Sequence, residues 1–134
     1  MGLTEIEKKT LIVLKIERAN ETIQEVPFLL EHGFYRTAIN RMYYACYYIV
    51  SALLMQENME ARTHKGIIAL FSMNFVKTGK VSEETGKLYR SLFELRQTGD
   101  YDEIKEIGKE DVDGRLEPAE KFIAEIERLI YNNI

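Results

Sequence analysis

An uncharged run of 14 residues, Met42–Met55, constrains the fold of this chain more than any other part of its sequence. Its letters, MYYACYYIVSALLM, are almost all apolar or aromatic. The run is long enough for a buried helix, but it is too short to cross a bilayer, which takes about 20 apolar residues. The sequence therefore predicts a helix over residues 34–57 and no membrane anchor.

Four tyrosines stand inside this run as two pairs, Tyr43 with Tyr47 and Tyr44 with Tyr48. Residues four apart lie on the same side of a helix, so two neighbouring faces are aromatic. A helix with one wet face is not built this way, and two interpretations stay open. Either the helix lies centrally in a bundle with its hydroxyls on polar partners, or the four tyrosines form the interface of a homodimer.

Elsewhere in the chain the apolar residues recur mostly at steps of three and four, which is the period of a helix. Pro27 is expected to kink or restart the first helix, and Gly33 is expected to end it. The acidic segment 100–114 is expected to be a loop or a short turn of helix. The expected helices span 4–32, 34–57, 63–76, 83–99 and a last segment that carries Leu116–Ile130, so the fold class is all-α.

The length of 134 residues, the net charge of −4 and the hydrophobic fraction of 46% describe one soluble domain over 1–134. Two histidines and one cysteine cannot assemble a structural zinc site, and no Glu-x-x-His pair exists for a di-iron bundle. We therefore expect no metal and no cofactor. The amino terminus has no apolar signal core, and with the lone Cys46 this suggests a cytoplasmic location.

Charge is distributed unevenly along the chain. Residues 34–82 hold six Lys or Arg and two Glu, a balance of +4, whereas the other residues hold 12 basic and 20 acidic side chains, a balance of −8. Overall acidity argues against broad, sequence-blind binding of nucleic acid. A local cationic groove that receives a phosphate is allowed, and the alternative is an ordinary solvated surface.

Polar residues at three helix ends are the candidates for chemistry, because the chain has no phosphate-binding glycine loop and no nucleophile elbow. His64 is a general base, a phosphate ligand, or only a packing or capping residue at a helix start. Arg96 is four residues from Asp100, and the two side chains can simply pair where the helix ends. In the functional alternative, Asp100 orients Arg96 toward a phosphate and Tyr101 lines the same cleft.

Three segments of the sequence resemble the HEPN family, helical domains named for nucleotide binding in higher eukaryotes and prokaryotes. They are HGFYRTAINRMYYACYYIVSALL at 32–54, THKGIIALFSMNFVKTG at 63–79 and LFELRQTGDYD at 92–102. The resemblance implies an up-and-down bundle of four to five helices and usually a homodimer. It also implies partnership with a minimal nucleotidyltransferase, often as a toxin and antitoxin pair.

The resemblance further implies that active members are metal-independent ribonucleases. They use an arginine followed, after four to six residues, by a histidine. Arg96 matches the arginine, but Tyr101, Asp102 and Glu103 stand where the histidine is expected, and no histidine follows His64. Neither a phenol nor a carboxylate easily replaces an imidazole that exchanges protons near neutral pH.

Two hypotheses about function follow. The first makes the chain a homodimeric binding module and not an enzyme, which binds a nucleotide, RNA or a nucleotidyltransferase partner in a two-component system. Its phosphate-facing residues are Arg41, His64, Lys65, Arg96 and Tyr101. The alternative is a metal-independent RNA-cleaving toxin with a degenerate motif, whose catalytic residues are Arg96, Asp100 and Tyr101, with His64 as a further candidate.

Overall fold

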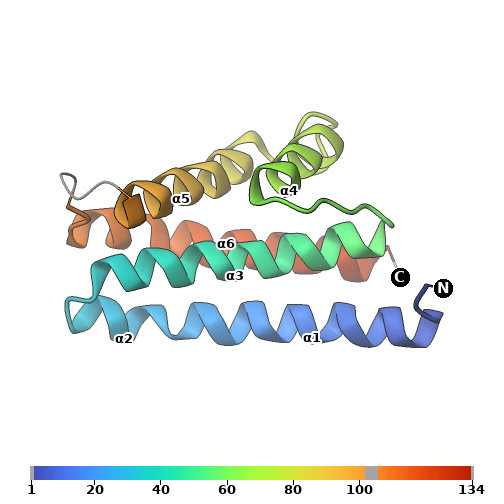
Figure 1. Cartoon of the computed structure of the whole chain (residues 1–134), viewed down its shortest axis with the longest axis horizontal. Coiled ribbons are helices and arrows are strands. Elements are labelled where there is room, and N and C mark those ends of the chain that lie inside the picture. The colour runs from blue at the N-terminus through green and yellow to red at the C-terminus, as the bar shows by residue number, and fades with distance from the viewer. Residues whose placement is uncertain (1, 102–105, 134) are drawn as a thin grey trace.

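The structure, a computed structural model, describes residues 2–101 and 106–133, and for residues 98–101 it describes the backbone but not the side chains. All regular elements of this part of the chain are helical, which confirms the all-α prediction. The long helices run alternately in opposite directions and form a bundle (Figure 1). The elements are α1 (Glu5–Gln24), α2 (Val26–Glu31), α3 (Tyr35–Gln56), α4 (His64–Phe71), the π-helical turn η1 (Ser72–Val76), α5 (Glu83–Tyr101) and α6 (Lys109–Asn132).

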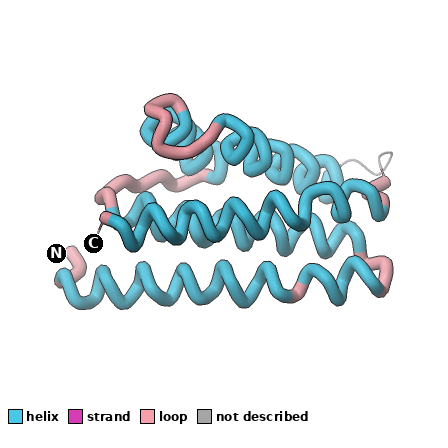
Figure 2. The backbone as a smooth tube through the Cα atoms, turned by 180° about the vertical axis from the view of Figure 1, so that it is seen from behind, coloured by secondary structure: helices cyan, strands magenta, loops and turns pink. Residues whose placement is uncertain are grey.

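Helix α3 lies at the centre of the bundle. It packs against α1, α2, α4, α5 and α6, and in the view from behind α6 lies in front of it (Figure 2). Half of its residues are buried, and they come from the uncharged run and the turn before it: Ala38, Ile39, Met42, Tyr43, Ala45, Cys46, Ile49, Val50, Ala52, Leu53 and Leu54. Packing inside this one chain therefore buries most of the apolar surface of α3.

Pro27 restarts the first helical segment, as one of the two expected outcomes. Helix α1 ends at Gln24, and α2 begins at Val26 with Pro27 in its first turn. A proline is tolerated there because the first N–H groups of a helix have no partner inside it. Gly33 has a φ of +78°, in the left-handed region that glycine adopts most easily, and it ends this segment as predicted.

The loop predicted over 100–114 is wrong in its second part, because α6 already begins at Lys109. The acidic residues that suggested a loop are helix-starting residues instead. The carboxylate of Asp111 accepts a hydrogen bond from the backbone N–H of Gly108 (2.9 Å), and acidic side chains in a first turn favour the helix dipole. Val112 is buried and anchors this turn, so Pro118 lies inside the helix rather than at its start.

The helix expected over 63–76 is present, but its second part is wound as the π-helix η1. Its start is fixed by Thr63, whose Oγ1 accepts a hydrogen bond from the N–H of Gly66 (2.9 Å). A Cβ on Gly66 would lie 3.0 Å from both Ala61 Cβ and Thr63 Oγ1, so the incoming chain approaches closely here. This close turn sets the position of His64 above α3.

No helix of the described residues has both the length and the apolar character that are needed to cross a membrane.

Candidate functional site

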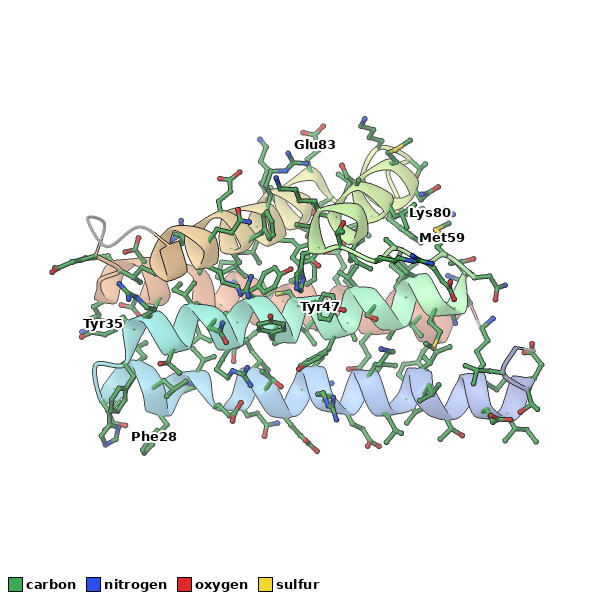
Figure 3. All side chains as sticks on the ribbon, in the orientation of Figure 1. Phe28, Tyr35, Tyr47, Met59, Lys80 and Glu83 are labelled. Atoms are coloured by element: carbon green, nitrogen blue, oxygen red, sulfur yellow. The ribbon has the colours of Figure 1, made fainter. Side chains whose placement is uncertain are left out.

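Five side chains from three helices meet on one side of α3. Tyr43, Tyr44 and Tyr47 come from α3, His64 is the first residue of α4, and Arg96 comes from the last part of α5. We call these five residues the aromatic–cation cluster. In Figure 3, Tyr47 lies on α3 below the start of α4, which marks the position of the cluster in the fold.

Arg96 binds two of the tyrosines at once. Its Cζ lies 5.3 Å from the ring centroid of Tyr43 and 5.1 Å from that of Tyr44. Its Nη2 donates a hydrogen bond to the hydroxyl of Tyr44 (3.1 Å). A guanidinium over an aromatic face is attracted by the negative face of the ring, so these contacts hold the cation in one place.

His64 is held by the same set of tyrosines. Its Nδ1 is hydrogen-bonded to the hydroxyl of Tyr43 (2.6 Å), and its ring centroid lies 5.0 Å from that of Tyr47 and 5.9 Å from that of Tyr44. Burial, and to a smaller extent the charge of Arg96, lowers the pKa of His64 from the ordinary value of 6.5. The imidazole is therefore neutral near neutral pH.

The three tyrosines of the cluster differ in exposure. Tyr43 is 0% exposed, and burial raises the pKa of its phenol well above the ordinary value, so that it keeps its proton. Tyr44 and Tyr47 are only half-buried. The cluster therefore has a buried side that fixes its geometry and an open side that a ligand can reach.

Arg41, one of the predicted phosphate-facing residues, lies next to the cluster. Its Cζ is 5.8 Å from the ring centroid of Tyr44, the ring that Arg96 also contacts. Its Nη1 is 3.9 Å from a carboxylate oxygen of Glu25, and its Nη2 donates to the side-chain oxygen of Asn40 (3.3 Å). Two guanidinium groups thus lie near one tyrosine ring.

The other predicted phosphate-facing residues are Lys65 and Tyr101, and of these two only Lys65 has a described side chain. Lys65 is exposed at the start of α4 and has none of the ring contacts or hydrogen bonds that join the cluster. Helix α5 extends to Tyr101, but the side chains of Asp100 and Tyr101 lie outside the described residues. The expected pairing of Arg96 with Asp100, and the catalytic roles of Asp100 and Tyr101, therefore stay predictions.

The position of the tyrosines also bears on the expected dimer interface. Tyr43 is completely buried inside its own chain, so it has no surface to offer to a second subunit. Tyr44, Tyr47 and Tyr48 are half-buried, and Cζ of Arg18 from α1 lies 5.5 Å from the ring centroid of Tyr48. A subunit contact through these three tyrosines stays a prediction.

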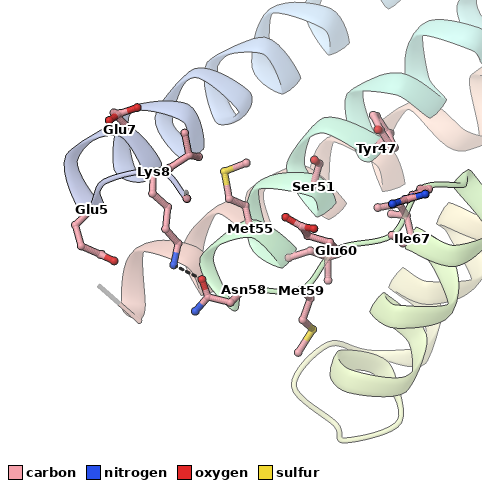
Figure 4. Close-up of a pocket in the computed structure, with 15 residues that line it drawn as sticks. Glu5, Glu7, Lys8, Tyr47, Ser51, Met55, Asn58, Met59, Glu60 and Ile67 are labelled. Carbon is pink, nitrogen blue, oxygen red and sulfur yellow. Dashed lines mark hydrogen bonds between the residues drawn. The ribbon is translucent and has the colours of Figure 1, made fainter.

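A cleft of about 950 Å³ opens beside the cluster, between the start of α1 and the chain that connects α3 to α4 (Figure 4). Tyr47 and Ser51 of α3 form its wall next to His64. At its far end the ammonium of Lys8 donates a hydrogen bond to the side-chain oxygen of Asn58 (2.8 Å), which ties α1 to the α3–α4 connection. The open side of the cluster therefore continues into a cleft.

The sequence singled out Arg96 and His64, and one of its two interpretations placed the tyrosine hydroxyls of a central helix on polar partners. The hydrogen bonds of Tyr43 to His64 and of Tyr44 to Arg96 agree with that interpretation, but the sequence did not indicate that these partners are the two candidate residues. The signal that could have found this is the pairing of tyrosines at a spacing of four on a helix that also faces two cationic segments.

The chemistry of this arrangement suits a phosphate ester. A guanidinium has a planar set of N–H donors that matches phosphate oxygens, and a neutral imidazole adds a donor or an acceptor. Half-exposed tyrosine rings offer stacking surfaces for unpaired bases. Among the described residues, no group of three or more His, Cys, Asp or Glu is placed to hold a metal ion.

The family model and the relatives that match this chain each cover most of its length. The family model described as HEPN domain matches residues 13–129. A protein of Thermotoga maritima named "UPF0332 protein" is 43% identical over 124 residues, which cover 92% of this chain and 94% of the relative. A protein of Methanocaldococcus jannaschii named "Putative toxin MJ0142" is 30% identical over 135 residues, which cover 100% of this chain and 92% of the relative. A second protein of that organism, "Putative toxin MJ0605", is 31% identical over 115 residues, which cover 86% and 85%.

Proposed function

The chain belongs to the HEPN domain family, and from this premise we propose that it is a toxin-like protein that binds RNA through the aromatic–cation cluster. It acts as one component of a two-component system with a nucleotidyltransferase. The toxin part of the proposal is supported by the names of two relatives from Methanocaldococcus jannaschii. The RNA part is supported by the geometry of the cluster.

The contact between Arg96 and Tyr44 is the observation that carries the proposal. It fixes a guanidinium at the open side of the cluster, next to a half-exposed aromatic ring and a neutral imidazole. A fixed cation beside stacking surfaces is typical of proteins that bind single-stranded nucleic acid. Because the chain as a whole carries a net charge of −4, binding is limited to this site and does not spread over the surface.

The shape of the surface favours a strand over a single nucleotide. Half-buried residues line the open side of α3 from Asn40 through Tyr44, Tyr47 and Ser51 to Met55, a length of about 22 Å at 1.5 Å per residue. Arg41 flanks one end, and the cleft beside Tyr47 lies toward the other. A ligand on this surface can place a phosphate at Arg96 and bases on both sides of it.

Binding is tested by fluorescence anisotropy with a labelled single-stranded RNA, in the presence of a chelator. Arg96→Ala is expected to weaken binding about tenfold or more, since a charge-assisted hydrogen bond contributes roughly 1.5–3 kcal/mol. Arg90→Ala is the matched control, because Arg90 lies on the same helix but is exposed and has no contact with the cluster tyrosines. Equal affinities of the wild type and Arg96→Ala, with both proteins folded by circular dichroism, would refute the proposal.

A metal-independent ribonuclease is the second candidate, and the position of His64 favours it. The sequence lacks a histidine after Arg96, but His64 lies on the same tyrosines as Arg96. An imidazole whose pKa is below its ordinary value of 6.5 can exchange protons close to neutral pH. This arrangement supplies the acid–base group whose absence from the sequence motif made RNA cleavage the second choice.

Cleavage is tested on end-labelled RNA with a chelator present. The ribonuclease candidate requires cleavage by the wild type and its loss in both His64→Ala and Arg96→Ala. RNA that stays intact while it binds with an affinity that depends on Arg96 would refute the ribonuclease and leave the binding proposal in place.

The partner is tested by identifying the adjacent genes and coexpressing the chain with a nucleotidyltransferase that they encode. A complex that survives affinity purification and gel filtration is expected. Separate elution of the two proteins would contradict this part of the proposal without affecting the RNA experiments.

A further inference from the structure

The hydrogen bond between Tyr43 and His64 determines which nitrogen of the imidazole carries the proton. Tyr43 Oη and His64 Nδ1 are 2.6 Å apart, so one proton is shared between them. In one arrangement the phenol donates to Nδ1, and in the other Nδ1–H donates to the phenol oxygen. The two arrangements leave His64 with opposite properties at Nε2, the nitrogen that does not face Tyr43.

The chemistry of the pair favours donation by the phenol. A phenol O–H is a stronger donor than a neutral imidazole N–H, and an imidazole nitrogen is a stronger acceptor than a phenol oxygen. Tyr43 keeps its proton because its burial raises the pKa. The neighbouring phenol of Tyr89, whose ring stacks on that of Tyr43 at 5.9 Å, does not take the Tyr43 proton. The contact between the two hydroxyls favours a lower pKa for Tyr43 and a higher pKa for Tyr89, as expected when Tyr89 is the donor.

The surroundings of His64 keep its ring neutral, so that the choice of nitrogen matters. Among the residues whose side chains are described, the groups that contact it or affect its charge are the phenols of Tyr43, Tyr44 and Tyr47 on α3 and the guanidinium of Arg96 on α5. None of these carries a negative charge when the phenols are protonated. A proton added to the imidazole would place a second cation next to Arg96.

We propose that Tyr43 is a positioning residue that holds His64 as the Nε2–H tautomer. Neutral His64 then offers a hydrogen-bond donor at Nε2 and works together with Arg96 as a second donor to a phosphate oxygen. In this state Nε2 cannot take a proton from a ligand, so the inference agrees with the RNA-binding proposal and excludes His64 as the general base of the ribonuclease candidate. The inference rests on the proposed function for its ligand, a phosphate ester, but the tautomer itself is a property of the free protein.

The tautomer is read from a long-range ¹H–¹⁵N correlation spectrum of the imidazole nitrogens, recorded well above the pKa of the ring. The chain has two histidines, His32 and His64, so the signals are assigned with the variant His32→Gln. His64 is expected to show a protonated Nε2 and an unprotonated Nδ1. A protonated Nδ1 in the wild type would overturn the proposal.

Tyr43→Phe removes the donor and keeps the buried ring. We expect the single tautomer of His64 to become a mixture and its pKa to rise, because a hydrogen bond donated to Nδ1 stabilises the neutral form. Tyr47→Phe is the matched control: it removes a hydroxyl from another ring that contacts His64, and both the tautomer and the pKa should stay unchanged. An unchanged tautomer in Tyr43→Phe, with the fold intact, would also overturn the proposal.

A titration with inorganic phosphate separates this inference from the proposed function. A change in the Nε2 signal of the wild type, reduced in Arg96→Ala, is expected if the two groups bind phosphate together. A correct tautomer with no response of Nε2 to phosphate would remove the role of His64 as a second donor, whereas loss of RNA binding alone would leave the tautomer result standing.

Discussion

Arg96 and Tyr44 are joined in two ways: the Nη2 of Arg96 donates to the hydroxyl of Tyr44 at 3.1 Å, and its Cζ lies 5.1 Å from the centroid of the Tyr44 ring. The two interactions depend on different parts of the tyrosine. The hydroxyl sets the direction of the guanidinium, and the ring face holds its charge. Substitutions at Tyr44 can therefore separate them.

Tyr44→Phe removes the hydroxyl and keeps the ring face. We expect a loss of about 0.5–1.5 kcal/mol in the free energy of unfolding, typical of one hydrogen bond, and a loss of RNA affinity of a few fold. Tyr44→Ala removes the ring as well and should weaken RNA binding further. Urea denaturation and fluorescence anisotropy measure the two effects. If Tyr44→Ala binds RNA as tightly as the wild type, the cluster is not the binding site.

The lowered pKa of His64 makes stability depend on pH in a defined direction. His64 takes up a proton near its ordinary pKa of 6.5 in the unfolded chain, but only at lower pH in the folded chain. Between these two values the unfolded state binds more protons, so the free energy of unfolding falls as the pH falls. It stops falling, as far as His64 is concerned, below the folded pKa.

Urea denaturation at a series of pH values tests this expectation. His64→Gln should reduce the fall in stability below pH 6.5, whereas His32→Gln leaves the contribution of His64 in place. The same slope in His64→Gln and in the wild type would show that His64 does not contribute to it.

Two helix glycines should respond to alanine in opposite directions. In α5, a Cβ on Gly86 would lie 3.0 Å and 3.2 Å from the two γ-carbons of Val76, and a branched side chain next to it cannot easily move away. In α6, a Cβ on Gly114 would meet nothing within 4 Å. Alanine is better than glycine inside a helix by about 1 kcal/mol, so Gly114→Ala should stabilise the protein.

Gly86→Ala, in contrast, should destabilise the protein, because the clash with η1 outweighs the gain in helix propensity. Thermal unfolding followed by circular dichroism measures both variants. Val76→Ala in the Gly86→Ala background should recover part of the loss. Equal stabilisation by both alanines would show that α5 and η1 are packed less closely than the distances to Val76 indicate.

The expected homodimer is testable through the tyrosines that keep exposed surface. We expect the wild type to sediment as a dimer at micromolar concentration. Tyr48→Ala should weaken the dimer if the half-buried tyrosines lie at the interface, whereas Tyr43→Phe should not change it, because Tyr43 is buried inside one chain. A monomeric wild type would contradict the prediction.

The sequence predicted the helices well where periodicity decides the structure. The uncharged run became α3 with the expected bounds to within one residue, because a long apolar run without charge can only be stable in the core. The start of α6 was missed because Gly114, Pro118 and several acidic residues are typical of loops. In the folded chain the carboxylates stabilise the first turn, and the buried Val112 holds it in place.

The sequence named two residues of the candidate site but did not predict that they lie close together. Arg96 and His64 are polar groups at helix ends, and their proximity depends on the path of the chain from α3 to α4, which hydrophobic periodicity does not define. The exposure of the tyrosines could not be predicted either. Both aromatic faces of α3 look alike in the sequence, and only the packing of the helices shows that Tyr43 is buried while Tyr44 and Tyr47 are half-exposed.

One consequence concerns the helix that carries His64. Helix α4 has 8 residues, and isolated helices of that length are not stable in water, so α4 depends on its contacts with neighbouring elements. Short, peripheral elements open locally at a lower free energy than the helices of a core. A ligand that contacts both His64 and Arg96 stabilises the packing of α4 against α3 and α5. Occupancy should therefore be seen as slowed amide hydrogen exchange over His64–Phe71, while the exchange rates of the central helix hardly change.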